Sequence, residues 1–369
     1  MYVQVSYKKQ IIVFLILFVL LLFAVEIGAR VIEYSGENKC EFIGKDAFKN
    51  VEIIKQNQIC EDSNSIMYEV DGILKFIPNQ NMETININSH GFRGHDFSEK
   101  KDLDTYRIFI VGGSTIFGSG TTSDDTTVPS FLQKKFKSTH SDQKIEILNA
   151  GIESAYSYSE KYLIENYLIK FQPDLIIIYS GGNDANNRYG VEYTVPGLPI
   201  SQLTQYVEQT DFVGSVKKFI KEINYRSPFV LMKIYKGMEQ NFTPSESTTN
   251  QVQELWTTRM GEICKANNDV GIKTVILVQP MLGSGNKQFS TDEKILLENY
   301  GAYMEDTLDI LNEIAGSLVE LENICHGTYD LRMIFDDVKE PLLFDHMHVT
   351  DLGNEIVAEE IYEILINQL

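Results

Sequence analysis

Cysteine is scarce in this sequence, and its spacing excludes one class of site. The 369 residues include four cysteines, which are Cys40, Cys60, Cys264 and Cys325. None of them forms a Cys-x-x-Cys pair, so the ligand spacing of a zinc site is missing. Cys40 and Cys60 flank a short segment and either form a disulfide in an oxidising compartment or stay as buried free thiols. The sequence leaves both alternatives open.

Basic residues are in short supply as well. Lys and Arg total 32 against 52 Asp and Glu, which gives a formal net charge of -20. A field of this sign repels the phosphates of nucleic acids and of anionic lipids, so neither is expected as a partner of the folded part. The sequence also lacks the Gly-Lys-Ser/Thr ending of a P-loop, the spacing of a dinucleotide fingerprint, internal repeats and low-complexity tracts.

One long apolar run stands near the N-terminus. Residues 11–25 are uninterruptedly apolar, which is short of the about 20 residues that a membrane span needs. The length is reached by continuing through Glu26 and Arg30 to Ile32, where long charged side chains can extend to the membrane interface. We therefore expect a transmembrane helix over residues 11–32.

The flanks of this run predict its orientation. Lys8 and Lys9 precede it, and basic residues stay on the cytoplasmic side of a membrane. No Ala-x-Ala site follows, which favours an uncleaved signal-anchor over a cleaved signal peptide; a buried core helix is the third alternative. The expected topology is a cytoplasmic tail over residues 1–10, a single-pass membrane anchor over 11–32 and a catalytic domain outside the cytoplasm.

The stretch at residues 108–120, IFIVGGSTIFGSG, organises the rest of the chain. A short apolar run closed by a turn signal predicts a strand buried on both faces. Gly112 and Gly113 permit a sharp turn that leaves Ser114 at the carboxyl end of that strand, where open α/β sheets bind their ligands. A serine held there is suited to nucleophilic catalysis. Taken alone, the same residues also fit an ordinary glycine-rich turn with an incidental serine.

Strands and helices alternate beyond this point, which predicts a three-layer α/β/α domain with a mostly parallel, doubly wound sheet. The predicted strands are 108–112, 144–148, 175–179, 274–278 and 331–335, and the predicted helices are 127–139, 158–171, 252–267, 292–314 and a closing helix that ends near residue 366.

Two segments interrupt or precede this pattern. Residues 33–102 form an N-terminal accessory segment before the domain at 103–369, and Gly91 and Gly94 in it predict a tight turn that presents Arg93. For Arg93, an ion pair that ties this segment to the domain is favoured over a contact with substrate. Residues 185–251 are rich in aromatics and too long for an ordinary loop, so we interpret them as an insertion that roofs the site or forms packed scaffold.

Four blocks in order resemble the SGNH (GDSL-type) hydrolase family, whose fold is flavodoxin-like. They are Ser114, Asn149-Ala-Gly151, Gly182-Asn183-Asp184 and Asp345-x-x-His348. The resemblance implies that Ser114 is the nucleophile, that His348 is the base and that Asp345 orients it. It also assigns the oxyanion donors to the backbone N–H groups of Ser114 and Gly151 and to the side-chain amide of Asn183. His346 is a competing base but falls off the Asp-x-x-His spacing.

The first block departs from the family pattern. It reads Gly112-Gly113-Ser114 where the family usually has Gly-Asp-Ser, and it is similar to the Gly-Gly-Ser-Thr form of membrane-anchored relatives. Their turn is likewise preceded by a Gly-Phe-Arg-Gly segment. Any support that the missing aspartate gives the turn is therefore in doubt, whereas the nucleophile is retained.

The resemblance implies a serine esterase that cleaves an acyl or acetyl ester through an acyl-enzyme, without a metal or an organic cofactor. The partners expected are an ester-bearing small molecule or an acylated glycan. One alternative is an O-acyltransferase that passes the same acyl group to a sugar hydroxyl. The other is a catalytically silent module that binds a glycan or a protein, against which the four intact blocks argue.

Overall fold

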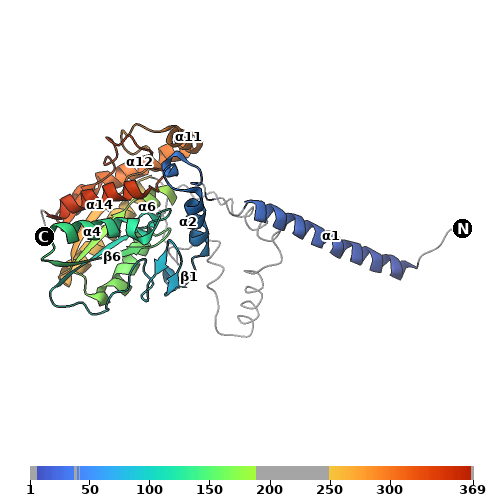
Figure 1. Ribbon diagram of the computed structural model, residues 1–369, viewed down its shortest axis with the longest axis horizontal. Helices are drawn as coiled ribbons and strands as arrows, with labels where there is room; N and C mark the ends of the chain where they lie inside the picture. The colour runs from blue at the N-terminus through green and yellow to red at the C-terminus, as the bar shows by residue number, and fades with distance from the viewer. Residues whose placement is uncertain (1–5, 37–39, 41, 188–248, 367–369) are drawn as a thin grey trace. The chain divides into compact units, whose positions relative to one another are not determined.

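The computed structural model describes residues 6–36, 40, 42–187 and 249–366 (Figure 1). The chain forms two compact units, one of Met1–Lys39 with Pro199–Ser245 and the other of Cys40–Leu198 with Glu246–Leu369. Almost all of the insertion predicted at 185–251 lies outside the described residues.

The described residues of the first unit form the long helix α1, over Tyr7–Gly36 (Figure 1). Its 30 residues give it a length of about 45 Å. The window Tyr7–Ala24 has a mean hydropathy of 2.1 and no buried residue, so it is long and apolar enough to cross a membrane. A signal sequence has the same properties. The predicted helix is present, and its role as an anchor stays a prediction.

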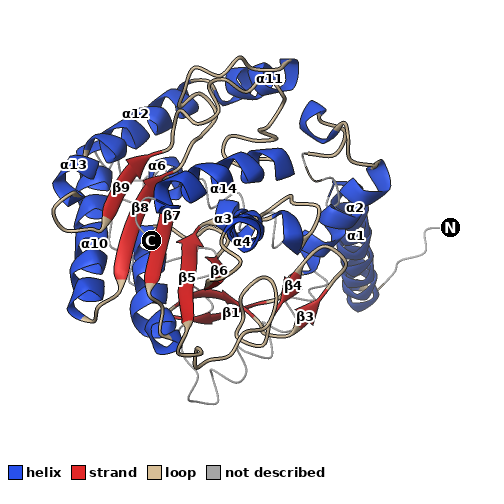
Figure 2. Cartoon of the chain, turned by 60° about the vertical axis from the view of Figure 1, so that its left-hand side comes forward, coloured by secondary structure: helices blue, strands red, loops and turns tan. Residues whose placement is uncertain are grey.

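The second unit is built around a parallel sheet of five strands in the order β6-β5-β7-β8-β9 (Figure 2). The strands are β5 (Thr105–Gly112), β6 (Lys144–Gly151), β7 (Leu175–Ser180), β8 (Lys273–Val278) and β9 (Gly327–Asp330). β5, the first of these five strands along the chain, thus lies second in the sheet, and the winding reverses between β5 and β7. Ligand crevices of doubly wound sheets lie at this reversal, outside the carboxyl ends of the strands.

Helices cover both faces of the sheet, because side chains alternate between two hydrophobic clusters along each strand. On β5, Phe109 and Val111 belong to one cluster, and Ile108 and Ile110 belong to the other. The first cluster includes side chains of α5 (Ser157–Leu163), α10 (Thr249–Asp269) and α12 (Ala302–Gly316), and the second includes those of α4 (Val128–Thr139), α11 (Thr291–Tyr300) and α14 (Asp351–Ile366). The three-layer prediction is confirmed. The short helices α3 (Ser114–Phe117), α6 (Gly182–Asn187) and α13 (Leu318–Leu321) complete the layers.

The predicted strand at 331–335 is wrong. The last strand is β9, and the residues after it form a turn in which the Arg332 side chain and backbone N–H donate to Asp330. Leu331 and Phe335 are buried members of the second cluster. Their apolar pattern therefore comes from packing in the core and not from a strand. β9 itself is a half-exposed edge strand and therefore lacks an apolar run.

Two predicted helices are shorter than expected. The one at 292–314 is divided into α11 and α12 at Gly301, whose φ of 48° and ψ of -132° are not helical. The one at 158–171 keeps α-helical geometry only in α5, after which the chain continues in wider and tighter turns over Ile164–Leu168 and Ile169–Phe171.

The part of the N-terminal segment from Cys40 onward folds with the sheet in one unit. It contains α2 (Ile53–Ser65), the antiparallel pair β1 (Tyr68–Asp71) and β2 (Ile73–Phe76), and the pair β3 (Gln80–Asn81) and β4 (Asn86–Ile87). A disulfide joins Cys40 to Cys60, and a second joins Cys264 to Cys325. Of the two alternatives left open for Cys40 and Cys60, the structure shows the disulfide.

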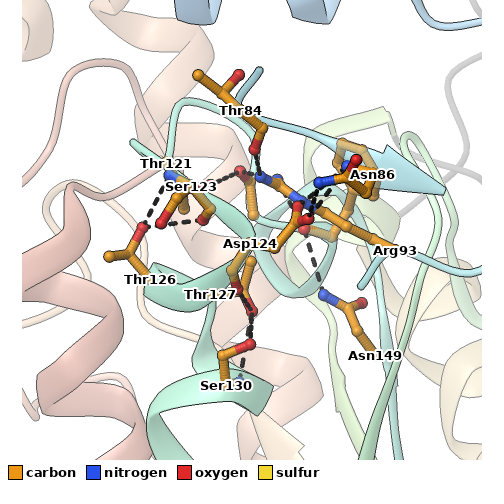
Figure 3. Close-up of polar contacts among 12 residues, drawn as sticks. Thr84, Asn86, Arg93, Thr121, Ser123, Asp124, Thr126, Thr127, Ser130 and Asn149 are labelled. Carbon is orange, nitrogen blue, oxygen red and sulfur yellow. Dashed lines mark hydrogen bonds and ion pairs between the residues drawn. The ribbon is translucent and has the colours of Figure 1, made fainter. Parts of the chain in front are cut away.

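Arg93 fixes this segment to the helix that carries the predicted nucleophile (Figure 3). Its side chain is 1% exposed, and its Nε atom donates to Asp124 at 2.7 Å. The terminal nitrogens donate to the carbonyls of Phe117 and Gly118 at 3.1 and 2.7 Å and to that of Thr84 at 2.8 Å. The Phe117 and Gly118 carbonyls stand at the C-terminal end of α3, where carbonyls have no partner within the helix. Arg93 therefore forms the structural ion pair that the sequence favoured.

We expect Asp124→Asn to lower the free energy of unfolding by about 2–3 kcal/mol. The variant leaves the buried Arg93 guanidinium without its counter-charge, and the loss is smaller than for a fully enclosed pair because Asp124 is partly exposed. Urea denaturation followed by circular dichroism measures it. Glu359→Gln is the matched control, since its pair with Lys135 is exposed and should contribute little. Equal losses in the two variants would contradict the structural role of Arg93.

Candidate active site

Ser114 lies at the carboxyl end of β5, as the first residue of α3. The two glycines before it are required by close packing. A Cβ atom on Gly112 would fall 2.6 Å from the Tyr179 carbonyl, and one on Gly113 would fall 2.5 Å from the Asn183 amide nitrogen. The tight turn therefore brings the backbone next to β7 and places the serine at the reversal point of the sheet. As the first helical residue, Ser114 has a backbone N–H without an intrahelical partner.

The structure brings His348 and Asp345 to this serine. His348 Nε2 lies 2.6 Å from Ser114 Oγ, and His348 Nδ1 lies 2.6 Å from Asp345 Oδ2. The other carboxylate oxygen, Asp345 Oδ1, accepts the backbone N–H groups of Met347 and His348 at 2.8 and 2.7 Å. The aspartate is thus fixed by the loop that it shares with the histidine. The three side chains form one hydrogen-bonded line in which the imidazole can take the serine proton.

The electrostatics of this line suit a general base. Burial would raise the pKa of Asp345, but the neighbouring His348 and the hydrogen bonds from its ring and from two backbone N–H groups lower that pKa to about 2. Burial would lower the pKa of His348, but the Asp345 charge and hydrogen bond, together with the charge of Glu153, raise it above the ordinary imidazole value. Asp345 is therefore ionised wherever His348 titrates, and it stabilises the imidazolium that forms during the reaction.

His346, the competing base, is directed elsewhere. Its Nδ1 atom lies 3.3 Å from the Tyr300 hydroxyl, and its ring meets the Tyr300 ring edge-on at 5.0 Å between centroids. Its backbone carbonyl accepts the N–H of Leu282. The hydrogen bond to Ser114 belongs to His348.

Asn183 lies beside Ser114, whereas the Gly151 N–H has a partner other than the expected oxyanion. The Asn183 amide donates to the Ala155 carbonyl at 2.7 Å and packs on Gly113. The Gly151 N–H donates to Asn149 Oδ1 at 2.9 Å, so it is already engaged. A Cβ atom there would fall 2.1 Å from the Phe117 nitrogen, so Gly151 is required for packing β6 against α3. The expected oxyanion donor at Gly151 is corrected accordingly.

The turn that follows Gly151 in the chain, around Ser154, lies next to Asn183. Ser154 has a φ of 61°, in the left-handed region that non-glycine residues rarely adopt. The next residue, Ala155, accepts the Asn183 amide, which places this turn next to the Asn183 side chain. Sequence reasoning missed it, because a serine gives no sign of a left-handed backbone.

Glu153 in the same turn is a second missed residue. The Ser119 hydroxyl donates to one carboxylate oxygen at 2.9 Å, and the Tyr68 hydroxyl from β1 donates to the other. The Glu153 charge contributes to the raised pKa of His348. The carboxylate therefore connects the N-terminal segment, α3 and the turn, and it adds a negative charge near the base.

A buried polar network lies behind Asn183. The Asp184 carboxylate accepts the Ser157 N–H at 3.0 Å and the Ser157 hydroxyl at 2.5 Å, and the Arg259 guanidinium donates to that hydroxyl at 3.0 Å. Ser180 donates to Glu160 at 2.6 Å. Burial raises the pKa of both acids, Glu160 and Asp184. The network ties the start of α6 to α5 and so fixes the position of Asn183.

A model of the GDSL-like lipase/acylhydrolase family matches residues 108–361, which is more than half of the chain and contains the whole hydrogen-bonded line. The chain belongs to this family. It is therefore a serine hydrolase of the esterase class. A search of curated proteins gives no match. Within the described residues, no group of three or more His, Cys, Asp and Glu side chains is placed to hold a metal ion.

Among solved structures, the GDSL esterase resembles a lipolytic protein of the G-D-S-L family from Desulfitobacterium hafniense at 14% identity, over 70% of this chain and 99% of that one, with a TM-score of 0.39. It resembles an acetyl xylan esterase, AlAXEase, at 14% identity over 70% and 99%, with a TM-score of 0.40. A two-domain esterase active on acetylated mannans matches at 14% identity over 71% and 49%, with a TM-score of 0.39. At these scores the likeness does not bear on the substrate.

We expect the activity to rise with pH through a pKa above that of an ordinary imidazole. His348 must be neutral to accept the serine proton, and its pKa is raised, so the rate is lost as pH falls through that higher value. Asp345→Asn removes the charge that raises it. The acidic limb should then move to lower pH while the maximal kcat falls by about 10⁴-fold. Profiles of kcat/KM against pH with an aryl acetate measure both effects.

His346→Ala is the matched control for this profile, since its ring contacts Tyr300. The limb and the maximal rate should stay close to those of the unmodified protein. If the acidic limb shifts in His346→Ala, or does not shift in Asp345→Asn, a group other than His348 is responsible for it.

Proposed function

We propose that this chain is an extracytoplasmic serine esterase that cleaves an acyl or acetyl ester through an acyl-enzyme. The observation that carries the proposal is the hydrogen-bonded line from Asp345 through His348 to Ser114, with both distances at 2.6 Å. It stands at the turn between β5 and α3, where the nucleophile reaches the ligand crevice of the sheet. A module that only binds a ligand has no need of this alignment.

The geometry supports the following sequence of steps. His348 Nε2 takes the proton of Ser114 Oγ as that oxygen bonds to the ester carbonyl carbon. The imidazolium is stabilised by Asp345 and then gives the proton to the leaving alcohol as the ester bond breaks. Water attacks the resulting acyl-enzyme and gives its proton to His348. The acid leaves, and Ser114 regains its proton.

The negative charge that develops on the carbonyl oxygen needs donors that are already in place. The backbone N–H of Ser114, at the N-terminus of α3, and the side-chain amide of Asn183 are the first two candidates. The third is the backbone of the turn at Ser154, which replaces Gly151 in this proposal. The Asn183 amide group has two N–H donors, so it can keep its bond to the Ala155 carbonyl while it donates to a bound substrate.

Two features support the proposed location outside the cytoplasm. Both cysteine pairs are joined in disulfides, which persist in oxidising compartments outside the cytoplasm. The single apolar helix stands near the N-terminus behind Lys8 and Lys9, an arrangement that leaves the C-terminal side outside the cytoplasm. We therefore propose that α1 anchors the enzyme and that the catalytic unit faces the exterior.

The substrate class is an ester-bearing small molecule or an acylated glycan. Transfer of the acyl group to a sugar hydroxyl would use the same serine, base and donors as hydrolysis. The aromatic residues of the insertion, which could bind such an acceptor, lie outside the described residues. Hydrolysis is proposed because water reaches an acyl group in an open crevice without a dedicated acceptor site.

Exposure to an activated aryl acetate should add one acetyl group to the protein, located on Ser114 by peptide mass spectrometry. Free acetate released in the same sample reports attack by water. Ser114→Ala should abolish the adduct and lower kcat by about 10⁴-fold or more, because the triad acts as a unit. Ser138→Ala, an exposed serine on α4, is the control and should be acetylated normally. Acetylation at any other residue would refute the nucleophile.

Protease added to intact cells or spheroplasts that express the full chain should digest the catalytic unit while a tag placed before Lys8 survives. This outcome follows if α1 spans the membrane with its lysines in the cytoplasm. Immunoblotting of the tag and of a C-terminal epitope measures it, and detergent lysis supplies the control in which both are cut. Protection of the C-terminal epitope in intact cells would place the catalytic unit in the cytoplasm.

A further inference from the structure

A third hydrophobic cluster joins the loop of the catalytic histidine to the N-terminal segment. Its buried members are Phe42, Phe48, Ile59, Cys60 and Phe344. In the part of the chain that the structure describes, Phe344 is the only member of this cluster that comes from beyond the segment 40–60, and it lies four residues before His348. The cluster is separate from the two that flank the sheet.

Phe344 packs flat on the base. Its ring and the His348 ring have centroids 5.7 Å apart and planes 13° apart. Phe42 and Phe48 meet the Phe344 ring edge-on, at 5.5 and 5.2 Å. Gly120 closes the remaining side, since a Cβ atom there would fall 2.5 Å from Phe344 Cζ. The phenylalanine ring is therefore enclosed by one face of the histidine, two rings of the N-terminal segment and the backbone that follows α3.

The segment that supplies these two rings is itself rigidly held. The Cys40–Cys60 disulfide closes it onto α2. Inside the loop, the buried Gln56 side chain donates to the carbonyls of Phe48 and Val51 at 3.0 and 2.8 Å and accepts the Gly44 N–H at 2.8 Å. Phe42 and Phe48 also stack on each other, with centroids 4.8 Å apart.

We propose that the disulfide-closed segment 40–60 is a positioning device for His348, acting through the contact of Phe42 and Phe48 with Phe344. The proposal rests on the esterase function proposed above, in which His348 is the base. It assigns to the N-terminal segment a role in catalysis, and it makes Phe42, Phe48 and Phe344 positioning residues.

The need for such a device follows from the geometry of the histidine. Its hydrogen bonds to Asp345 and Ser114 are made at Nδ1 and Nε2 and fix the line between these two atoms. They do not fix rotation of the ring plane about that line, and the terminal torsion of histidine has broad preferences. The flat contact with Phe344 restricts this rotation. Phe344 can restrict it only while Phe42 and Phe48 keep its own ring in place.

The first test is Phe48→Leu, which removes one supporting ring and keeps an apolar side chain. We expect kcat for an aryl acetate to fall about 10- to 100-fold with KM nearly unchanged, because a small misalignment of the base affects the chemical step. The acidic limb of the pH profile should move to lower pH, because the pairing of His348 with Asp345 loosens. Phe344→Leu should show the same changes, and Phe48→Tyr, which keeps the ring, should restore most of kcat.

Phe136→Leu is the matched control. Phe136 is as buried as Phe48 and packs edge-on against Tyr362 between α4 and α14. It should lose a similar amount of stability in urea denaturation without a fall in kcat. If Phe48→Leu and Phe136→Leu lower kcat equally, or if Phe48→Leu raises KM alone, the positioning role is refuted.

The second test uses the disulfides and does not depend on packing variants. Cys40→Ser with Cys60→Ser should slow the reaction of Ser114 with a fluorophosphonate probe about tenfold or more. Cys264→Ser with Cys325→Ser is the control, because that disulfide precedes the amino end of β9, opposite the edge of the sheet that carries Ser114. Its labelling rate should be unchanged.

The probe also separates this proposal from the proposed function. It reacts with a serine activated by a base whatever the natural ester is. An unmodified protein that reacts neither with the probe nor with aryl acetates would overturn the esterase function itself. Normal labelling of Ser114 in both disulfide variants, with the unmodified protein active, would overturn only the positioning role of segment 40–60.

Discussion

The contact between Ser114 Oγ and His348 Nε2 is the constraint on which the rest of the structure depends. It joins residues 234 positions apart, and a short hydrogen bond tolerates little error in the placement of either side chain. The doubly wound sheet solves the larger part of this problem, because β5 delivers the serine to the reversal point of the winding. The loop between Leu343 and Val349 delivers the histidine, held by a bridge between those two residues.

The N-terminal segment contacts each part of this assembly through a different residue. Arg93 binds the carbonyls at the end of α3, Tyr68 binds the Glu153 carboxylate in the turn that contains Ser154, and Phe42 and Phe48 enclose Phe344 in the loop of His348. Gly113, which stands where the family usually has aspartate, has little room for a side chain. The Asn183 amide packs so closely on Gly113 that a side chain there would displace it. The other end of α3 is held by the Arg93 guanidinium, which donates to the Phe117 and Gly118 carbonyls.

Most of the fold was predicted from apolar runs, and most of the candidate site was predicted from the order of the four blocks. β5, β7 and β8 are buried on both faces, so their sequences show the run directly, and the Asp-x-x-His spacing distinguished His348 from His346. The edge strand β9 was missed because a half-exposed strand needs no such run. The donor assigned to Gly151 failed because a side-chain bond from Asn149 and a left-handed serine leave no sign in the sequence. Phe344 was missed because its partners lie about 300 positions earlier, and contacts of that range have no local pattern.

The residues that hold Ser114 and His348 in place therefore extend beyond the part of the chain that forms the sheet. Residues 33–102 precede every strand of the five-stranded sheet, yet from Cys40 onward they contact α3 and the loop of His348. Cys40 follows the last residue of α1, Gly36, by only four positions. If α1 crosses the membrane, the second unit begins outside it with the segment that aligns the histidine. A catalytic unit released from the anchor keeps this alignment only when the cut falls before Cys40, since the disulfide that closes the segment begins there.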